Sequence, residues 1–233
     1  DCNTTGWENI RMTDTMYAKR LGSMLTAVRM PYNSMVSSCI DRYTKKNRSQ
    51  VSYMLGISEF YMPMIEEEID RMGLPHELKY LPIIESAMNP KAKSRMGAKG
   101  LWQFMFTTGK QYGLKSNNYI DERFDPLKST RAALTYLKDL YDMFGNWELA
   151  IAAYNCGPGN VNKAITRSGG NKYDYDGSFW DVYERLPRET RNYVPLYMGA
   201  TYAFAYHKAH GVDYPTPPMP LATDTIMINR PLH

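Results

Sequence analysis

The chain has 233 residues, of which 43% are hydrophobic and 22% are charged. This composition, with a mean hydropathy of −0.51, excludes a disordered polypeptide and a protein embedded in a membrane. Its 28 basic and 24 acidic residues leave a net charge of +4, too small for a dedicated nucleic-acid-binding protein but suited to work beside an acidic polymer. Tyrosine is common, with 19 residues, and most of these are expected to be structural. Tyr136, Tyr141 and Tyr197 lie at helical spacings that suit packing.

Regular helical spacing begins only after residue 30, so residues 1–30 are interpreted as an N-terminal extension. Apolar residues spaced three and four apart then predict one helix over residues 36–43 and a second over residues 51–72. Gly73 is expected to end the second helix.

The next segment, residues 78–85, is nearly all apolar and ends in a lone acid. A proline inside a helix costs roughly 3 kcal/mol, so Pro82 predicts a kink or an early end there. A loop rich in glycine and lysine follows over residues 91–100, and a short apolar segment over residues 101–107.

The clearest helix signal is Asp125-Pro126, a capping residue followed by proline at the first helical position. The helices expected from here onward cover residues 126–144, 147–156, 179–186 and 189–210. The sequence therefore predicts a mainly α-helical single domain over residues 31–210. A proline-rich C-terminal tail or linker over residues 211–233 follows it.

The three cysteines, Cys2, Cys39 and Cys156, form neither a disulfide framework nor a zinc motif. A bridge between Cys39 and Cys156 remains possible in an oxidising compartment, and Cys2 is a candidate for lipid attachment. The four histidines form no ligand set, so neither a metal nor a cofactor is expected. No segment has the ~20 apolar residues of a transmembrane helix.

Glu85 is the strongest candidate for chemistry because it directly follows the apolar run 81–84. Burial beside such a run raises the pKa of a carboxyl, and a carboxyl that stays protonated can donate a proton to a leaving oxygen. The alternative is a structural acid at a helix end, paired with Lys79 or Arg95. Spacing alone favours that alternative.

Three further segments are candidates for binding. Residues 97–105 combine small residues with Gln103, whose amide suits a sugar hydroxyl or an N-acetyl group. Residues 152–155 present a Tyr-Asn pair before a Gly-Pro-Gly turn, and residues 189–194 form the last segment. Each also has a purely structural interpretation, as a turn, a helix end or part of a helix.

The order and spacing of these segments resemble one family. The residues that carry the resemblance are Leu74-Pro75, Glu77-Leu78, Leu81-Pro82-Ile83-Ile84-Glu85-Ser86-Ala87-Met88-Asn89-Pro90, Gly97-Ala98-Lys99-Gly100-Leu101-Trp102-Gln103-Phe104-Met105, Asp121-Glu122-Arg123, Ala152-Ala153-Tyr154-Asn155, Glu189-Thr190-Arg191 and Tyr193-Val194-Pro195. They are similar to the catalytic domains of the soluble lytic transglycosylases, glycoside hydrolase family 23. The resemblance covers roughly residues 32–206 and implies a lysozyme-like fold of the goose type, with residues 31–210 as the catalytic domain.

By this resemblance Glu85 is the single catalytic acid and base. The residues implied to bind the saccharide are Ser94, Gln103, Met105, Ala153, Tyr154, Asn155 and Tyr193. The chain departs from the family pattern at Phe106, where proline is common, and at Cys156, where alanine is usual. Neither departure is expected to touch the chemistry, although Phe106 is expected to affect the floor of the groove.

The resemblance implies cleavage of peptidoglycan between N-acetylmuramic acid and N-acetylglucosamine, with a 1,6-anhydro product. A lone acid agrees with such a reaction because ordinary glycosidases need two carboxylates. Asp121, Glu122 and Asp125 are interpreted as a surface or capping cluster and Glu189 as a helix-start acid. The alternatives are a hydrolytic muramidase and a catalytically silent peptidoglycan-binding module. Either way, the expected location is the bacterial cell envelope, periplasmic or at the outer membrane.

Overall fold

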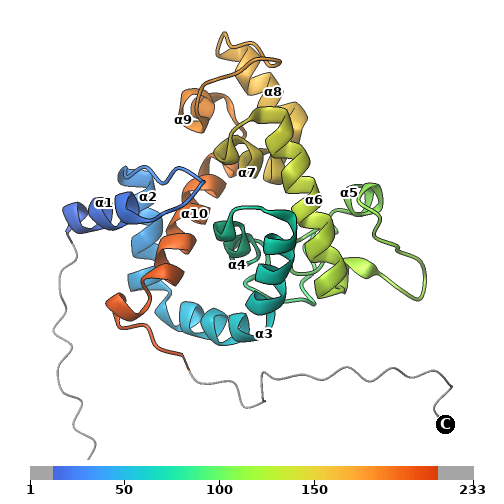
Figure 1. The fold of residues 1–233 in the computed structure, drawn as a ribbon, viewed down its shortest axis with the longest axis horizontal. Helices are drawn as coiled ribbons and strands as arrows, with labels where there is room; N and C mark the ends of the chain where they lie inside the picture. The colour runs from blue at the N-terminus through green and yellow to red at the C-terminus, as the bar shows by residue number, and fades with distance from the viewer. Residues whose placement is uncertain (1–12, 215–233) are drawn as a thin grey trace, which may run out of the picture.

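The computed structural model describes residues 13–214, and these are mainly helical (Figure 1). Over this range there is no β-strand, only three isolated bridges between loop residues. The mainly α-helical fold expected from the sequence is therefore confirmed. The tail from Pro215 onward and Cys2 lie outside the described residues.

The described part of the chain contains ten α-helices and five segments of 3-10 or π-helix. The α-helices are α1 (Asp14–Ser23), α2 (Ser34–Asp41), α3 (Arg48–Met72), α4 (Leu81–Ser86), α5 (Phe106–Gln111), α6 (Pro126–Phe144), α7 (Trp147–Cys156), α8 (Pro158–Arg167), α9 (Phe179–Val182) and α10 (Arg188–Ala205). A π-helical turn, η1 (Arg42–Lys46), joins α2 to α3. The 3-10 turns are η2 (His76–Tyr80), η3 (Glu122–Phe124), η4 (Tyr183–Arg185) and η5 (Lys208–His210).

The predicted start of α6 and the predicted end of α3 are confirmed, whereas α10 ends at Ala205 and not at residue 210 as expected. The side chain of Asp125 accepts a hydrogen bond from the backbone N–H of Lys128 at 2.9 Å and so caps α6. Gly73 ends α3 in the left-handed conformation, with φ of 63°. These features are set by neighbours in the chain, which is why the sequence predicts them.

Pro82 does not kink a helix, as the sequence suggested, but lies in the first turn of α4. The first turn is the one place where the missing N–H of proline is no loss. Residues 76–80 form the 3-10 turn η2 instead of continuing the helix. The result is a short helix of six residues whose last turn carries Glu85.

Three helices, α1, α5 and α8, have no counterpart in the sequence prediction. Helix α1 lies inside the presumed extension, yet Tyr17 and Leu21 are buried in the core and the Tyr17 hydroxyl donates to Asp41 at 2.9 Å. Helix α8 begins at Pro158 directly after Gly157, a combination that indicates a turn when read alone. The division of the chain into extension, domain and tail stays a prediction.

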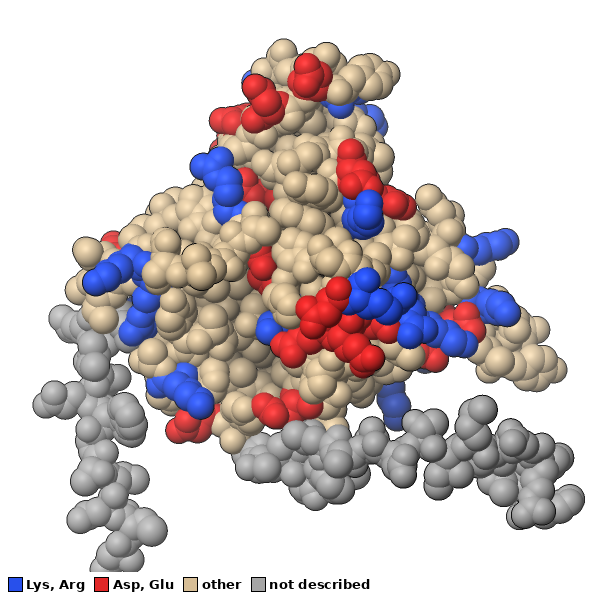
Figure 2. Space-filling view, viewed as in Figure 1, with Lys and Arg blue, Asp and Glu red and all other residues tan. Residues whose placement is uncertain are grey.

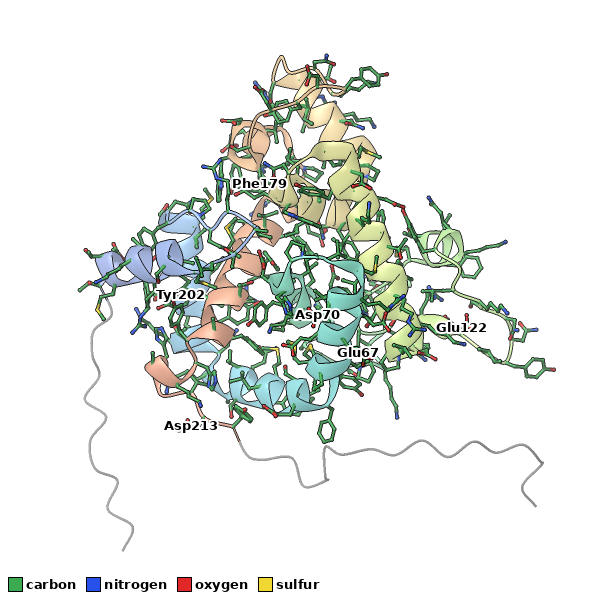
Figure 3. All side chains as sticks on the ribbon, viewed as in Figure 1. Glu67, Asp70, Glu122, Phe179, Tyr202 and Asp213 are labelled. Carbon is green, nitrogen blue, oxygen red and sulfur yellow. The ribbon has the colours of Figure 1, made fainter. Side chains whose placement is uncertain are left out.

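Helix α10 runs through the middle of the molecule, with α1 and α2 on one side and α4 on the other (Figure 1). Its backbone lies so close to α2 that a Cβ at Gly199 would be 2.7 Å from the Cβ of Cys39. Tyr202, labelled in Figure 3, is fully buried on α10 and its ring meets that of Tyr17 edge-on at 5.5 Å. This central helix ties the N-terminal helices to the part of the fold that carries Glu85.

Cys39 and Cys156 are both free, so the possible bridge between them is not formed. Between residues 13 and 214, no helix is long and apolar enough to cross a membrane. On the face shown in Figure 2, acidic and basic side chains are intermixed. Glu67 and Asp70, labelled in Figure 3, belong to an acidic group on α3 that has arginines beside it.

Candidate active site

Glu85 lies at the end of α4 and lines a cavity of about 760 Å³. The pKa of its carboxyl is raised to about 7, chiefly by burial and also by the negative charge of Glu189, while a hydrogen bond from Tyr193 opposes the rise. Half of the carboxyl groups are therefore protonated near neutral pH. A carboxyl in this state can give up a proton and take one back.

Tyr193 on α10 holds the carboxyl, because its hydroxyl donates a hydrogen bond to Oε1 of Glu85. Burial, together with the nearby Glu85 charge, keeps the pKa of the Tyr193 hydroxyl well above its ordinary value, so this group stays a donor. Tyr154 on α7 lines the same cavity and donates to the carbonyl of Trp102 at 2.8 Å. Two helices far apart in the sequence thus place phenols beside one acid.

The loop that carries Gln103 forms another wall of the cavity. Gln103 has φ of 49°, in the left-handed region, and its Nε2 donates to the carbonyl of Gly100 at 2.8 Å. The hydroxyl of Ser86 donates to the carbonyl of Leu101 at 2.9 Å. Because Ser86 follows Glu85 directly, this bond connects α4 to the loop.

Arg123 holds the same loop in place through hydrogen bonds to its backbone. It is 4% exposed, and its Nη1 donates to the carbonyls of Gly97 and Phe104 at 3.1 and 3.2 Å. A Cβ at Gly100 would lie 1.8 Å from the carbonyl oxygen of Arg123, so only glycine fits there. Hydrogen bonds from Arg123 in turn lower the pKa of Asp121 well below its usual range.

Asp121, Glu122 and Asp125, the acids interpreted as a surface or capping cluster, each have a structural role. Asp121 caps η3, pairs with Arg123 at 2.7 Å and with Lys99 at 2.9 Å, and is largely buried. Glu122 pairs with Lys128 at 2.6 Å, and Asp125 caps α6. None of the three lines the cavity of Glu85.

The structure brings most of the expected site residues to this one cavity. Those that line it are Glu85, Ser94, Gln103, Met105, Tyr154, Asn155 and Tyr193. Ala153 is the exception, because its side chain is completely buried in the core and lines no part of the cavity. One step along a helix turns a side chain by about 100°, so Tyr154 faces the cavity while Ala153 does not.

Several residues of the cavity were not expected there. Tyr136 was assigned to packing, but its ring lies 5.4 Å from that of Tyr154 and lines the cavity. Glu189 starts α10 as expected and also lines the cavity, as does Cys156. Phe106 lies outside the lining and packs under the guanidinium of Arg123. The helical spacing of Tyr136 is the same for a residue that packs in the core and for one that lines the cavity, so the sequence could not distinguish them.

Glu85 is not paired with Lys79 or Arg95, the alternative that spacing alone favoured. Lys79 pairs with Glu66 at 2.5 Å instead, and Glu85 forms no ion pair with any residue from 13 to 214. The same part of the chain contains no group of three His, Cys, Asp or Glu side chains arranged to hold a metal ion. The carboxyl of Glu85 thus has no ion-pair partner among the described residues, and phenols and amides line the cavity around it.

Residues 62–176 match the family model of the transglycosylase SLT domain. This part of the chain is a transglycosylase SLT domain. The chain is 35% identical over 204 residues to membrane-bound lytic murein transglycosylase D of Escherichia coli (strain K12), covering 87% of this chain and 44% of that protein. The chain thus spans less than half of this relative.

Solved structures agree with the SLT assignment. The 70 kDa soluble lytic transglycosylase of Escherichia coli superimposes with a TM-score of 0.52 at 27% identity, over 73% of this chain and 30% of that one. An inactive glutamate-to-glutamine mutant of the lytic transglycosylase Slt from Pseudomonas aeruginosa gives 0.50 at 25% identity, over 69% and 25%. The fold of the SLT chain is therefore the lysozyme-like fold of lytic transglycosylases, as expected.

Proposed function

We propose that this SLT domain cleaves the β-1,4 bond between N-acetylmuramic acid and N-acetylglucosamine in peptidoglycan without adding water. The observation that carries the proposal is the Glu85 carboxyl, whose pKa is raised to about 7 at an open cavity and which has Tyr193 as its hydrogen-bond donor. Relatives of this chain are named lytic murein transglycosylases, which supports peptidoglycan as the substrate.

Glu85 acts first as an acid. Its protonated carboxyl gives a proton to the glycosidic oxygen, the C1–O bond breaks, and the acetamido group of the muramyl sugar stabilises the cation at C1. The carboxylate left behind then takes the proton of the muramyl 6-hydroxyl, whose oxygen bonds to C1. The proton balance closes on Glu85, and the product is a 1,6-anhydromuramyl end.

The other residues of the cavity bind and orient the strand. Tyr193 aims the carboxyl and stabilises its charged form between the two steps. Gln103 and Asn155 offer amides for sugar hydroxyls and N-acetyl groups, although the Asn155 oxygen already accepts from Thr190 at 2.9 Å. Tyr154 and Met105 supply apolar surface for sugar rings. Ser94 provides a hydroxyl at the rim.

Hydrolysis is the second candidate, because Glu189 lines the same cavity as Glu85. A second carboxylate near the first could activate water and make the domain a muramidase. Mass spectrometry of digested peptidoglycan distinguishes the reactions, since an anhydro end is lighter than a hydrolysed end by one water. We expect anhydro ends, and products with hydrolysed ends would overturn the proposal.

A silent peptidoglycan-binding module is tested by the loss of turbidity of purified cell walls. We expect the wild-type chain to clear the suspension, and a suspension that stays turbid while the protein binds to it would contradict catalysis. The substrate places the protein in the bacterial cell envelope, in the periplasm or at the outer membrane. Attachment by a lipid at Cys2 belongs to the same proposal.

A further inference from the structure

A second compartment, of about 390 Å³, adjoins the main cavity at Glu85. Ile84, Glu85, Gln103 and Leu196 line both spaces. The acid therefore lies where two compartments meet, and a polymer bound across it would occupy both. We call the second space the basic compartment, after Arg42 and Lys93, which line it.

The two compartments differ in charge. Among the described residues, the main cavity is lined by no lysine or arginine, and its only acid besides Glu85 is Glu189. The basic compartment is lined by Arg42 and Lys93, with no acid except Glu85. A strand that passes Glu85 thus meets a neutral-to-acidic surface on one side and a basic surface on the other.

Neither basic group is neutralised by an acid within residues 13–214. The nearby carboxylate of Asp41 pairs with Lys45 at 2.8 Å and leaves Arg42 without an ion-pair partner. Lys93 lies 5.5 Å above the ring of Phe124, a contact that orders the side chain and leaves its charge available.

The local backbone holds Arg42 at the compartment. Arg42 is the first residue of the π-helical turn η1, a rare structure often found at functional sites. The next two residues, Tyr43 and Thr44, are buried, and the hydroxyl of Thr44 donates to the carbonyl of Ile40 at 2.9 Å. The turn is thus anchored in the core, while the Arg42 side chain is exposed.

We propose that the basic compartment binds a carboxylate carried by the muramyl residues of the strand. This inference rests on the proposed function, because peptidoglycan differs from a plain acetamido-glucan in bearing a lactyl group and a peptide stem on every second sugar. Arginine and lysine bind carboxylates through charge-assisted hydrogen bonds. The side-chain amides of Asn47 and Gln50, in the same lining, suit peptide groups.

The test measures equilibrium binding in a Glu85→Gln background, in which turnover does not interfere. The double variant Arg42→Gln/Lys93→Gln is compared with Lys46→Gln/Lys91→Gln, which removes the same charge from exposed neighbours outside the compartment. Titration calorimetry gives Kd for three ligands. These are chitotetraose, which has no carboxylate, muramyl strands without stems, which bear lactyl carboxylates, and strands with intact stems.

We expect the Arg42/Lys93 variant to bind at least one carboxylate-bearing strand about tenfold more weakly, with chitotetraose affected by less than about twofold. The control variant should stay within about twofold of the background for every ligand. Weakening confined to stem-bearing strands assigns the carboxylate to the stem, and weakening confined to stem-free strands assigns it to the lactyl group. The charge-retaining variant Arg42→Lys/Lys93→Arg should restore most of the affinity.

Equal weakening for chitotetraose, or equal weakening in the control variant, would overturn the inference, because the effect would then not depend on the carboxylate or on position. Unchanged Kd values for all ligands would overturn it as well. The thermal unfolding of each variant is recorded to show that it is folded. Failure of the proposed function gives a different result, namely no cleavage of any strand by the chain with Glu85 intact.

Discussion

Glu85 and Glu68 are two largely buried carboxylates of the same domain with opposite surroundings. The side chain of Glu68, on α3, is 4% exposed and accepts hydrogen bonds from Arg71 on its own helix and from Arg131 on α6. Hydrogen bonds from Arg131, with those from Arg71, lower the pKa of Glu68. Glu85 has a single neutral donor, Tyr193, and burial raises its pKa to about 7.

The difference shows that burial alone does not decide what a glutamate does. Where arginines meet the carboxylate, burial strengthens an ion pair that joins α3 to α6. Where the hydrogen-bond donor is a neutral phenol, burial keeps the carboxyl ready to exchange a proton. The same residue type thus stabilises the fold at one place and, under the proposed function, supplies the acid and base at the other.

The largest expected effect comes from replacing Glu85. Glu85→Gln should lower kcat/KM on peptidoglycan by about a thousandfold, because an amide cannot donate and recover the proton. Release of soluble muropeptides measures this. Glu68→Gln serves as the matched control and should retain most activity well below its unfolding temperature. Residual activity of Glu85→Gln within tenfold of wild type would mean that the acid is a different residue.

The same variant should be more stable than wild type at alkaline pH. The folded-state pKa of Glu85, about 7, lies above the ordinary value of 4.5, so folding opposes ionisation. The penalty is absent below about pH 4.5 and complete above about pH 7, where it reaches up to about 3 kcal/mol, less where solvent screens the carboxyl. Denaturant unfolding at about pH 8 should therefore favour Glu85→Gln, and the advantage should vanish near pH 4.

Tyr193→Phe should widen the difference in pKa between Glu85 and Glu68. Without the phenol donor the pKa of Glu85 rises, so the alkaline limb of the kcat/KM profile shifts to higher pH while kcat falls about tenfold or more. Tyr202→Phe, which removes a buried phenol that does not line the cavity, is the control. A limb that stays in place, or moves to lower pH, would contradict the assigned hydrogen bond.

Glu68→Gln should reduce the free energy of unfolding by about 1–2 kcal/mol near neutral pH, a modest value because both arginines are more than half exposed. The lowered pKa of Glu68 makes its contribution present above about pH 4.5 and lost as the pH falls. The gap between variant and wild type should therefore close on acidification. Glu85→Gln has the opposite sign, because its gain in stability over wild type grows as the pH rises. A gap for Glu68→Gln that widens at acid pH would be incompatible with the ion pair.

Glu189→Gln should have the smallest effect. Removing this negative charge lowers the pKa of Glu85, so the alkaline limb should shift to lower pH with little change in kcat. Glu184→Gln, in the preceding turn and highly exposed, is the control and should leave the profile unchanged. If Glu189→Gln abolished turnover instead, the hydrolytic mechanism with two carboxylates would be favoured.

Much of the site could be predicted because its signals lie close together in the chain. The apolar run before Glu85 indicates burial, and the turn after Asn155 places Tyr154 at a helix end. Tyr141 and Tyr197, which were expected to pack, do so: Tyr141 stacks on Trp147 at 4.3 Å and Tyr197 is fully buried. For Tyr141 the neighbour in sequence is also the packing partner, whereas the Tyr197 hydroxyl donates at 2.9 Å to the carbonyl of Glu77, far away in the chain.

Other features depend on how helices meet, and the sequence does not contain them. Tyr136 has the same helical spacing as a core residue but faces the cavity, because α6 presents that turn to Tyr154 on α7. Ala153 was grouped with the cavity wall by its place in a motif, yet it points into the core. The start of α8 was taken for a turn because proline and glycine favour both.

By itself the sequence determined where α3 and α6 end and which acid follows an apolar run, since each depends on residues close together in the chain. Tertiary structure alone decided the surroundings of Glu85 and Glu68, and with them the pKa of each carboxyl. Tyr193 reaches Glu85 across 108 positions of the chain, and Arg131 reaches Glu68 across 63. A pKa is set by the charges and donors that surround a group in space, and packing of α10 on α4 and of α6 on α3 supplies them.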